Sequence, residues 1–115
     1  GEASLRMLIK ATFEFLRELH QYCKPSETSF NPLTERAVQQ ELAQILLNWL
    51  KQVRGLTIQQ RALLETVAAV MSWAIFGIAA EWSHNGQKLS AEEMTNQVFL
   101  VLTEGVARLV PGLLS

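Results

Sequence analysis

His20 and Cys23 have the residue types and the spacing of metal ligands. An imidazole and a thiol three residues apart lie on the same side of a helix and could share a zinc ion. A zinc site needs three or four ligands, and the only other histidine, His84, is far away in the sequence. We therefore expect no metal, and we interpret His20 as packed beside a buried thiol. A single cysteine also excludes an internal disulfide and favours a reducing, cytoplasmic location.

Other patterns that carry chemistry are missing from the sequence. It contains no G-x-S-x-G nucleophile motif and no glycine-rich phosphate loop. Glu92 and Glu93 follow Ser90 in the manner of first-turn helix residues, and His84 has the position of a helix-end cap. The sequence therefore predicts no catalytic residue and no cofactor, and indicates that the protein is not an enzyme.

Length and composition describe one globular domain, residues 1–115. Hydrophobic residues make up 49% of the chain and charged residues only 18%, so the surface is expected to be under-charged and to include an interface. The net charge of −1 provides no basic field that would attract nucleic acid. We also expect no signal peptide, because helix-patterned sequence with charges begins at once.

The longest uncharged run, Thr66–Ala80, lies within a helix predicted over residues 58–84. A bilayer span needs about 20 apolar residues, and Glu65 and Glu81 close this run, so a soluble helix is expected. Helical spacing predicts two apolar faces and one narrow polar strip. The first face comprises Leu64, Val67, Met71, Ile75, Ile78 and Trp82; the second Ala69, Val70, Trp73, Phe76, Gly77 and Ala80; the strip Glu65, Ser72 and Ser83. Such a helix must be covered nearly all round, so one face is expected to meet another molecule.

Three further helices are predicted, over residues 3–22, from Thr34 to Gly55, and from Ser90 to about Val110. Thr57 and Ser90 each open a capping box, and residues 25–33 have the composition of an ordered loop. Nothing has the period of a strand, and the fold class is all-α. The expected architecture is an antiparallel bundle of four main helices.

Aromatic residues and small residues suggest two kinds of contact. Side chains expected to face inward include Phe13, Phe15, Trp49, Trp73 and Trp82. They are compatible with an ordinary core, or with an apolar ligand cavity in which His20 is the main polar group. Gly77, with Ala80 and Ala69, would let a helix approach closely, either from the same chain or from another.

The segment Ser72–Val106 resembles the last two helices of the regulatory domain of the tetracycline-repressor (TetR) family. Its W-A-I-x-G-x-A-x-x-W run, short N-G turn and S-x-E-E helix start carry the resemblance, which extends more weakly over the first two helices. The resemblance implies a bacterial transcriptional regulator whose DNA-binding helix-turn-helix domain is missing from this chain. It also implies a homodimer formed as a four-helix bundle by the final two helices of each subunit.

The resemblance assigns two sets of residues. The expected dimer surface is Ala69, Trp73, Phe76, Gly77, Ala80, Phe99 and Val106, and the expected ligand pocket is lined by Phe13, Leu16, His20, Trp49 and Met71. The effector would be a small aromatic or lipophilic molecule, neutral or cationic, because no arginine or lysine is expected to point inward. No partnership with DNA or a membrane is expected for this chain. The competing interpretation is a stand-alone helical module that binds a different protein.

Overall fold

The computed structural model describes residues 2–22, 32–86 and 88–109. The described chain contains no strand, so the all-α prediction is confirmed. Its helices are α1 (Glu2–Tyr22), α2 (Pro32–Lys51), the short α3 (Ile58–Ala62), α4 (Leu64–His84) and α5 (Ala91–Leu109). The predicted loop over 25–33 lies largely outside the described residues.

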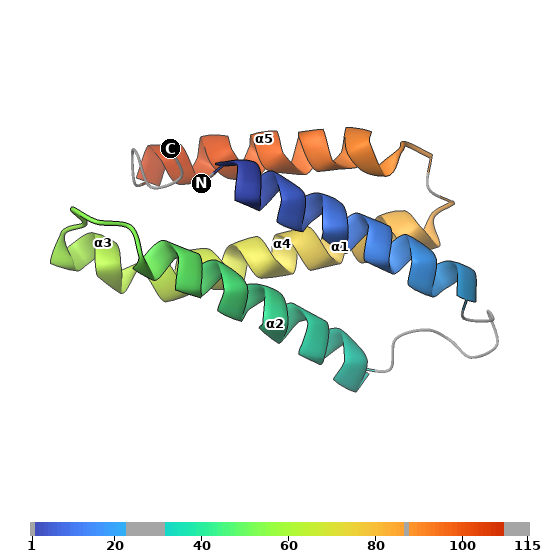
Figure 1. The fold of residues 1–115 in the computed structure, drawn as a ribbon, viewed down its shortest axis with the longest axis horizontal. Coiled ribbons are helices and arrows are strands. Elements are labelled where there is room, and N and C mark those ends of the chain that lie inside the picture. The colour runs from blue at the N-terminus through green and yellow to red at the C-terminus, as the bar shows by residue number, and fades with distance from the viewer. Residues whose placement is uncertain (1, 23–31, 87, 110–115) are drawn as a thin grey trace.

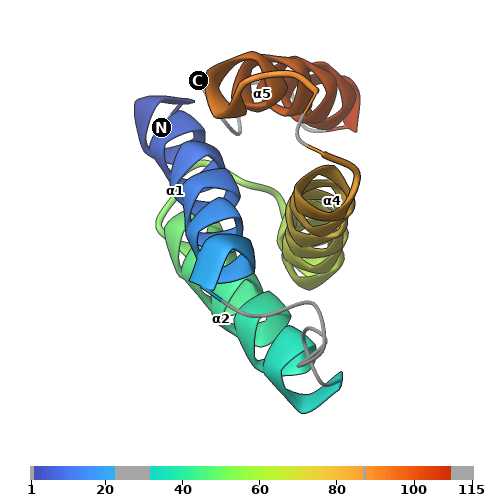
Figure 2. The ribbon, with the colours of Figure 1, turned by 90° about the vertical axis from the view of Figure 1, so that its right-hand side faces the viewer.

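The four long helices run in alternating directions along the chain, and their contacts follow a different order from the sequence (Figure 1). α4 packs against α2 and α1, and α5 packs mainly against α1. Only a few residues of α4 and α5 touch, although the two helices are neighbours in sequence. Figure 2 shows this arrangement from one end, with α5 lying across the N-terminal part of α1. α1 therefore connects α5 to the remaining helices.

The core is built from one face of each long helix. It combines Leu5, Ile9, Phe13 and Leu16 of α1, Leu42, Leu46 and Leu50 of α2, Leu64, Val67, Met71, Ile75 and Trp82 of α4, and Val98, Leu102 and Val106 of α5. The first predicted face of α4 is thus buried, apart from Ile78, which is 40% exposed. Burial of these side chains is the main stabilising contribution to the fold.

Both predicted capping boxes are present. The Thr57 hydroxyl accepts from the Gln60 amide, and the Gln60 side chain accepts from the Thr57 amide. The Ser90 hydroxyl and the Glu93 carboxylate make the same reciprocal pair at the start of α5. These bonds satisfy amide groups that a helix start leaves without partners.

Two predicted helix boundaries were wrong. α2 begins at Pro32 rather than after Thr34, and proline suits the first position of a helix because it has no amide hydrogen to leave unpaired. The single helix expected over 58–84 is divided at Leu63, whose amide bonds to the Gln60 carbonyl in a tighter turn than the α-helix makes. A separate helix, α4, then begins at Leu64. It ends as predicted at His84, and Gly86 follows with φ of 83°.

Only Glu65 of the predicted polar strip of α4 is exposed to solvent. Ser72 and Ser83 are buried, and each donates its hydroxyl to the carbonyl three residues earlier, Ala69 and Ala80 respectively. A serine that bonds its own helix in this way can enter the interior without leaving a polar group unpaired. Ser72 also accepts a hydrogen bond of 2.8 Å from the buried side-chain amide of Gln39 on α2.

α4 is the one described helix that is long and apolar enough to cross a membrane by length and composition. Core helices of soluble proteins meet the same criterion. One face of α4 forms much of the interior here, which is consistent with a soluble globular protein.

Candidate interaction surface and groove

The second predicted face of α4 lies mostly at the surface. Val70, Trp73 and Gly77 follow one another at helical spacing, and all three are exposed, Trp73 to 55%. We call these three residues the α4 stripe. A side-chain carbon added at Gly77 would meet nothing within 4 Å. Contact with another helix of the described chain therefore does not explain the glycine, which costs about 1 kcal/mol relative to alanine inside a helix.

α5 presents a comparable exposed patch. Leu100 and Val101 are exposed, Val101 to 71%, and they lie one turn before Gly105. Gly105 is also exposed, and a side-chain carbon added there would meet nothing within 4 Å. The two long helices at the C-terminal end of the chain thus share an unusual combination, a mid-helix glycine beside uncovered large apolar residues.

The residues expected at the dimer surface divide into three groups. Trp73 and Gly77 are exposed, and Ala69, Ala80 and Phe99 are half-buried. Phe76 and Val106 belong to the core of their own chain, where Phe76 is only 4% exposed. Their assignment to the surface was wrong, because the buried arc of each helix extends further round than the spacing suggested.

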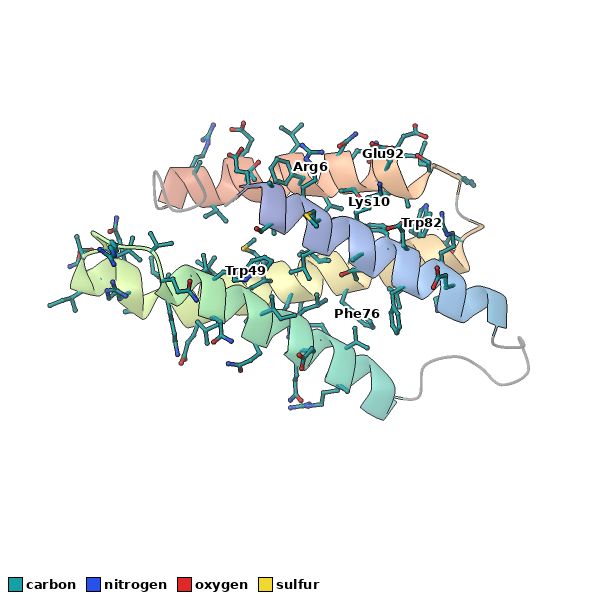
Figure 3. All side chains as sticks on the ribbon, in the orientation of Figure 1. Arg6, Lys10, Trp49, Phe76, Trp82 and Glu92 are labelled. Carbon is teal, nitrogen blue, oxygen red and sulfur yellow. The ribbon has the colours of Figure 1, made fainter. Side chains whose placement is uncertain are left out.

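Phe99 is covered by a residue of α1. The Arg6 guanidinium lies 4.2 Å from the centre of the Phe99 ring and donates a hydrogen bond to the Asn96 side chain. Figure 3 shows Arg6 reaching from α1 to α5. A cation over an aromatic face is attracted by the partial negative charge on that face, which arises from the ring quadrupole. This contact holds the N-terminal part of α1 to the middle of α5.

The residues expected to line an interior pocket do not all meet. Phe13, Leu16 and Met71 are fully buried members of one core cluster. Trp49 is outside that cluster and is 37% exposed, so the expectation that it faces inward was wrong. The side chain of His20 lies outside the described residues, as does Cys23.

A groove that the sequence analysis did not anticipate lies where α4 turns into α5. Its volume is about 660 Å³, and its lining is Ile78, Glu81, Trp82, Asn85, Lys88, Leu89 and Met94. The lining comes from the last two turns of α4, the connecting turn and the first turn of α5. The lining combines the apolar residues Ile78, Trp82, Leu89 and Met94 with the polar residues Glu81, Asn85 and Lys88.

Trp82 lines this groove, and two contacts hold its side chain in place. Its indole nitrogen donates a 2.8 Å hydrogen bond to the Leu89 carbonyl, which ties α4 to the turn before α5. Its ring meets the Phe13 ring edge to face, with the centres 5.3 Å apart and the planes at 69°. Figure 3 places Trp82 beside the turn that joins the two helices. Contacts on two sides hold the indole in one orientation.

The charged groups of the groove have no ionic partner among the described residues. Glu81 and Lys88 are both exposed, and neither belongs to the ion pair that the described residues form on α1 between Arg17 and Glu14, 3.9 Å apart. No group of three or more His, Cys, Asp or Glu side chains within that same part could hold a metal ion. The groove therefore combines apolar lining residues with one exposed carboxylate and one exposed ammonium group.

Comparison with protein families, with curated proteins and with solved structures finds no match to this chain.

Proposed function

We propose that the protein is a homodimerising, effector-sensing domain of a TetR-like transcriptional regulator. The proposed dimer is supported by the exposed α4 stripe and by the exposed patch of α5, which contains Leu100, Val101 and Gly105. Each patch places large uncovered apolar side chains next to a glycine that has open space above it. Small residues of this kind allow close approach of a second helix.

A second copy is the occupant that best fits these surfaces. An isologous contact covers both copies of the stripe at once, so each apolar side chain contributes twice. Full burial of a large apolar side chain contributes about 1.5–3 kcal/mol, and Trp73 is already partly covered. A four-helix contact between two α4–α5 pairs is also the geometry that the sequence resemblance implies.

The regulatory part of the proposal concerns a small molecule and a separate DNA-binding domain. This chain carries ten lysine and arginine residues against eleven aspartate and glutamate residues, so it lacks the positive charge that DNA contact requires. An effector bound to this domain would control DNA binding by another domain. The competing proposal, a module that binds a different protein through the same surface, predicts a monomer in isolation.

The purified chain should therefore behave as a dimer, with twice the 12.9 kDa mass of one chain. Gly77→Glu should give monomers of unchanged helicity, because the new side chain meets nothing in its own chain but would place a charge within the dimer contact. Size-exclusion chromatography with light scattering across a range of concentrations measures this. Gly105→Glu provides a second test on α5.

Ala37→Glu is the matched control, since it adds the same charge at an exposed position of α2. It should leave the dimer intact. If Gly77→Glu and Gly105→Glu both dimerise as tightly as the parent protein, the proposed interface is wrong. A parent protein that stays monomeric at all concentrations would favour the interaction module instead.

A further inference from the structure

The groove at the α4–α5 turn has the size and the lining of a small-molecule site. Ligand pockets commonly enclose about 300–1,000 Å³ and combine apolar walls with a few polar groups. The groove is open to solvent on one side, but its volume of about 660 Å³ falls within that range, and Ile78, Trp82, Leu89 and Met94 form its apolar part. Glu81, Asn85 and Lys88 supply the polar part.

The charge around the groove favours a cation. Glu81 projects from the last turns of α4, where the carbonyl end of the helix carries partial negative charge. Glu92 and Glu93 lie in the first turn of α5, although the Glu93 carboxylate already accepts from the Ser90 amide. Lys88 is the one lysine or arginine between Glu81 and Glu93. Within residues 81–93, three carboxylates (Glu81, Glu92 and Glu93) therefore stand against one lysine.

We propose that the groove binds an organic cation with an aromatic or aliphatic body. The body lies on Trp82 and Met94, and the positive group faces Glu81 and the carbonyl end of α4. The assignment rests on the proposed sensing function, because it names the site and the chemical class of the effector. It places that site at the turn between the helices rather than among the core residues Phe13, Leu16 and Met71.

An occupant of the groove would touch both helices of the proposed dimer surface. α4 and α5 make few direct contacts, and the Trp82 hydrogen bond to Leu89 is a direct link between α4 and the turn. A ligand between Ile78 and Met94 would add contacts between these two helices. Binding would thus favour one angle between α4 and α5 over others.

A pair of nearly isosteric ions tests the charge preference. Titration calorimetry in sodium buffer should show tetraphenylphosphonium binding with one site per chain, about tenfold more tightly than tetraphenylborate. The two probes share four phenyl groups and differ in charge, so general hydrophobic attraction acts on both. Equal affinities, or tighter binding of the borate, would overturn the proposal.

Single substitutions locate the site. Glu81→Gln should weaken phosphonium binding about two- to fivefold, and Lys88→Gln should strengthen it by a similar factor, as expected for exposed charges. Glu41→Gln and Lys51→Gln make the same changes at exposed positions of α2 and should have no effect. Ile78→Lys should abolish binding while the circular dichroism spectrum stays that of the parent. Unchanged affinity in Glu81→Gln and Ile78→Lys would show that the groove is not the site.

The proposed dimer interface and the proposed ligand site in the groove can be tested independently. Phosphonium binding that responds to these substitutions in a monomeric protein supports the groove and rejects the dimer. A dimer that Gly77→Glu disrupts but that binds neither ion supports the dimer and rejects the groove.

Discussion

Replacing Phe13 with alanine should lower the free energy of unfolding by about 3–5 kcal/mol. Phe13 is fully buried, and its ring meets Trp82 edge to face, so it joins α1 to α4 at the centre of the core. The substitution removes this contact and leaves a cavity that the surrounding side chains fill only in part. Urea unfolding followed by circular dichroism, at a fixed protein concentration, measures the change.

Phe15→Ala is the control from the same helix. Phe15 is 49% exposed, so the same chemical change should cost about 1 kcal/mol or less. A similar loss in both variants would contradict the orientation of α1 that the structure describes.

Replacing Ser72 with alanine should cost about 1–3 kcal/mol. The side-chain amide of Gln39 donates to the Ser72 hydroxyl, and both groups are buried between α2 and α4. Without the hydroxyl, that amide hydrogen would remain inside the protein without a partner, which is the main cause of the loss. The same urea measurement applies.

Ser83→Ala is the matched control, because Ser83 is also buried on α4 and also bonds the carbonyl three residues earlier. Among the described residues it has no hydrogen-bond partner on another helix, and its loss should cost under about 1 kcal/mol. Ser72→Ala combined with Gln39→Leu should recover part of the stability, since neither buried polar group then remains unpaired. Strictly additive losses in the double variant would contradict the pairing.

Local signals in the sequence predicted the local structure well. The capping boxes at Thr57 and Ser90 form as expected, because each depends only on residues within one helical turn. The end of α4 before Gly86 depends in the same way on a residue that tolerates positive φ. The start of α2 was predicted less well, because Thr34 and Pro32 are both suitable residues for a helix start.

The orientation of the helices was harder to predict, since it depends on their neighbours. Phe76 and Trp73 lie only three residues apart on α4, yet one is buried and the other is exposed. The difference arises from how far α1 and α2 wrap round α4, which residue spacing does not reveal. Ser72 was misjudged because its polarity suggested solvent, whereas Gln39, distant in sequence, provides a buried partner.

The groove could not have been predicted from the pattern of any one helix. It depends on Glu81 and Trp82 of α4, Leu89 of the turn and Met94 of α5 being brought together by the angle between two helices. Periodicity describes faces of single helices, and it carries no information about that angle. The aromatic residues predicted an interior cavity lined by Trp49, whereas the groove in the structure lies beside Trp82.

The order of helix contacts has a consequence for synthesis of the protein. α1 makes its main contacts with α4 and α5, and the bond from Arg6 to Asn96 joins residues 90 positions apart. During translation, α1 therefore leaves the ribosome long before its partners exist, with the apolar side of Leu5, Ile9 and Phe13 uncovered. Closure of so long a loop is slow compared with formation of a local helix pair. The nascent chain should accordingly expose a chaperone-binding segment at α1 until α5 has emerged.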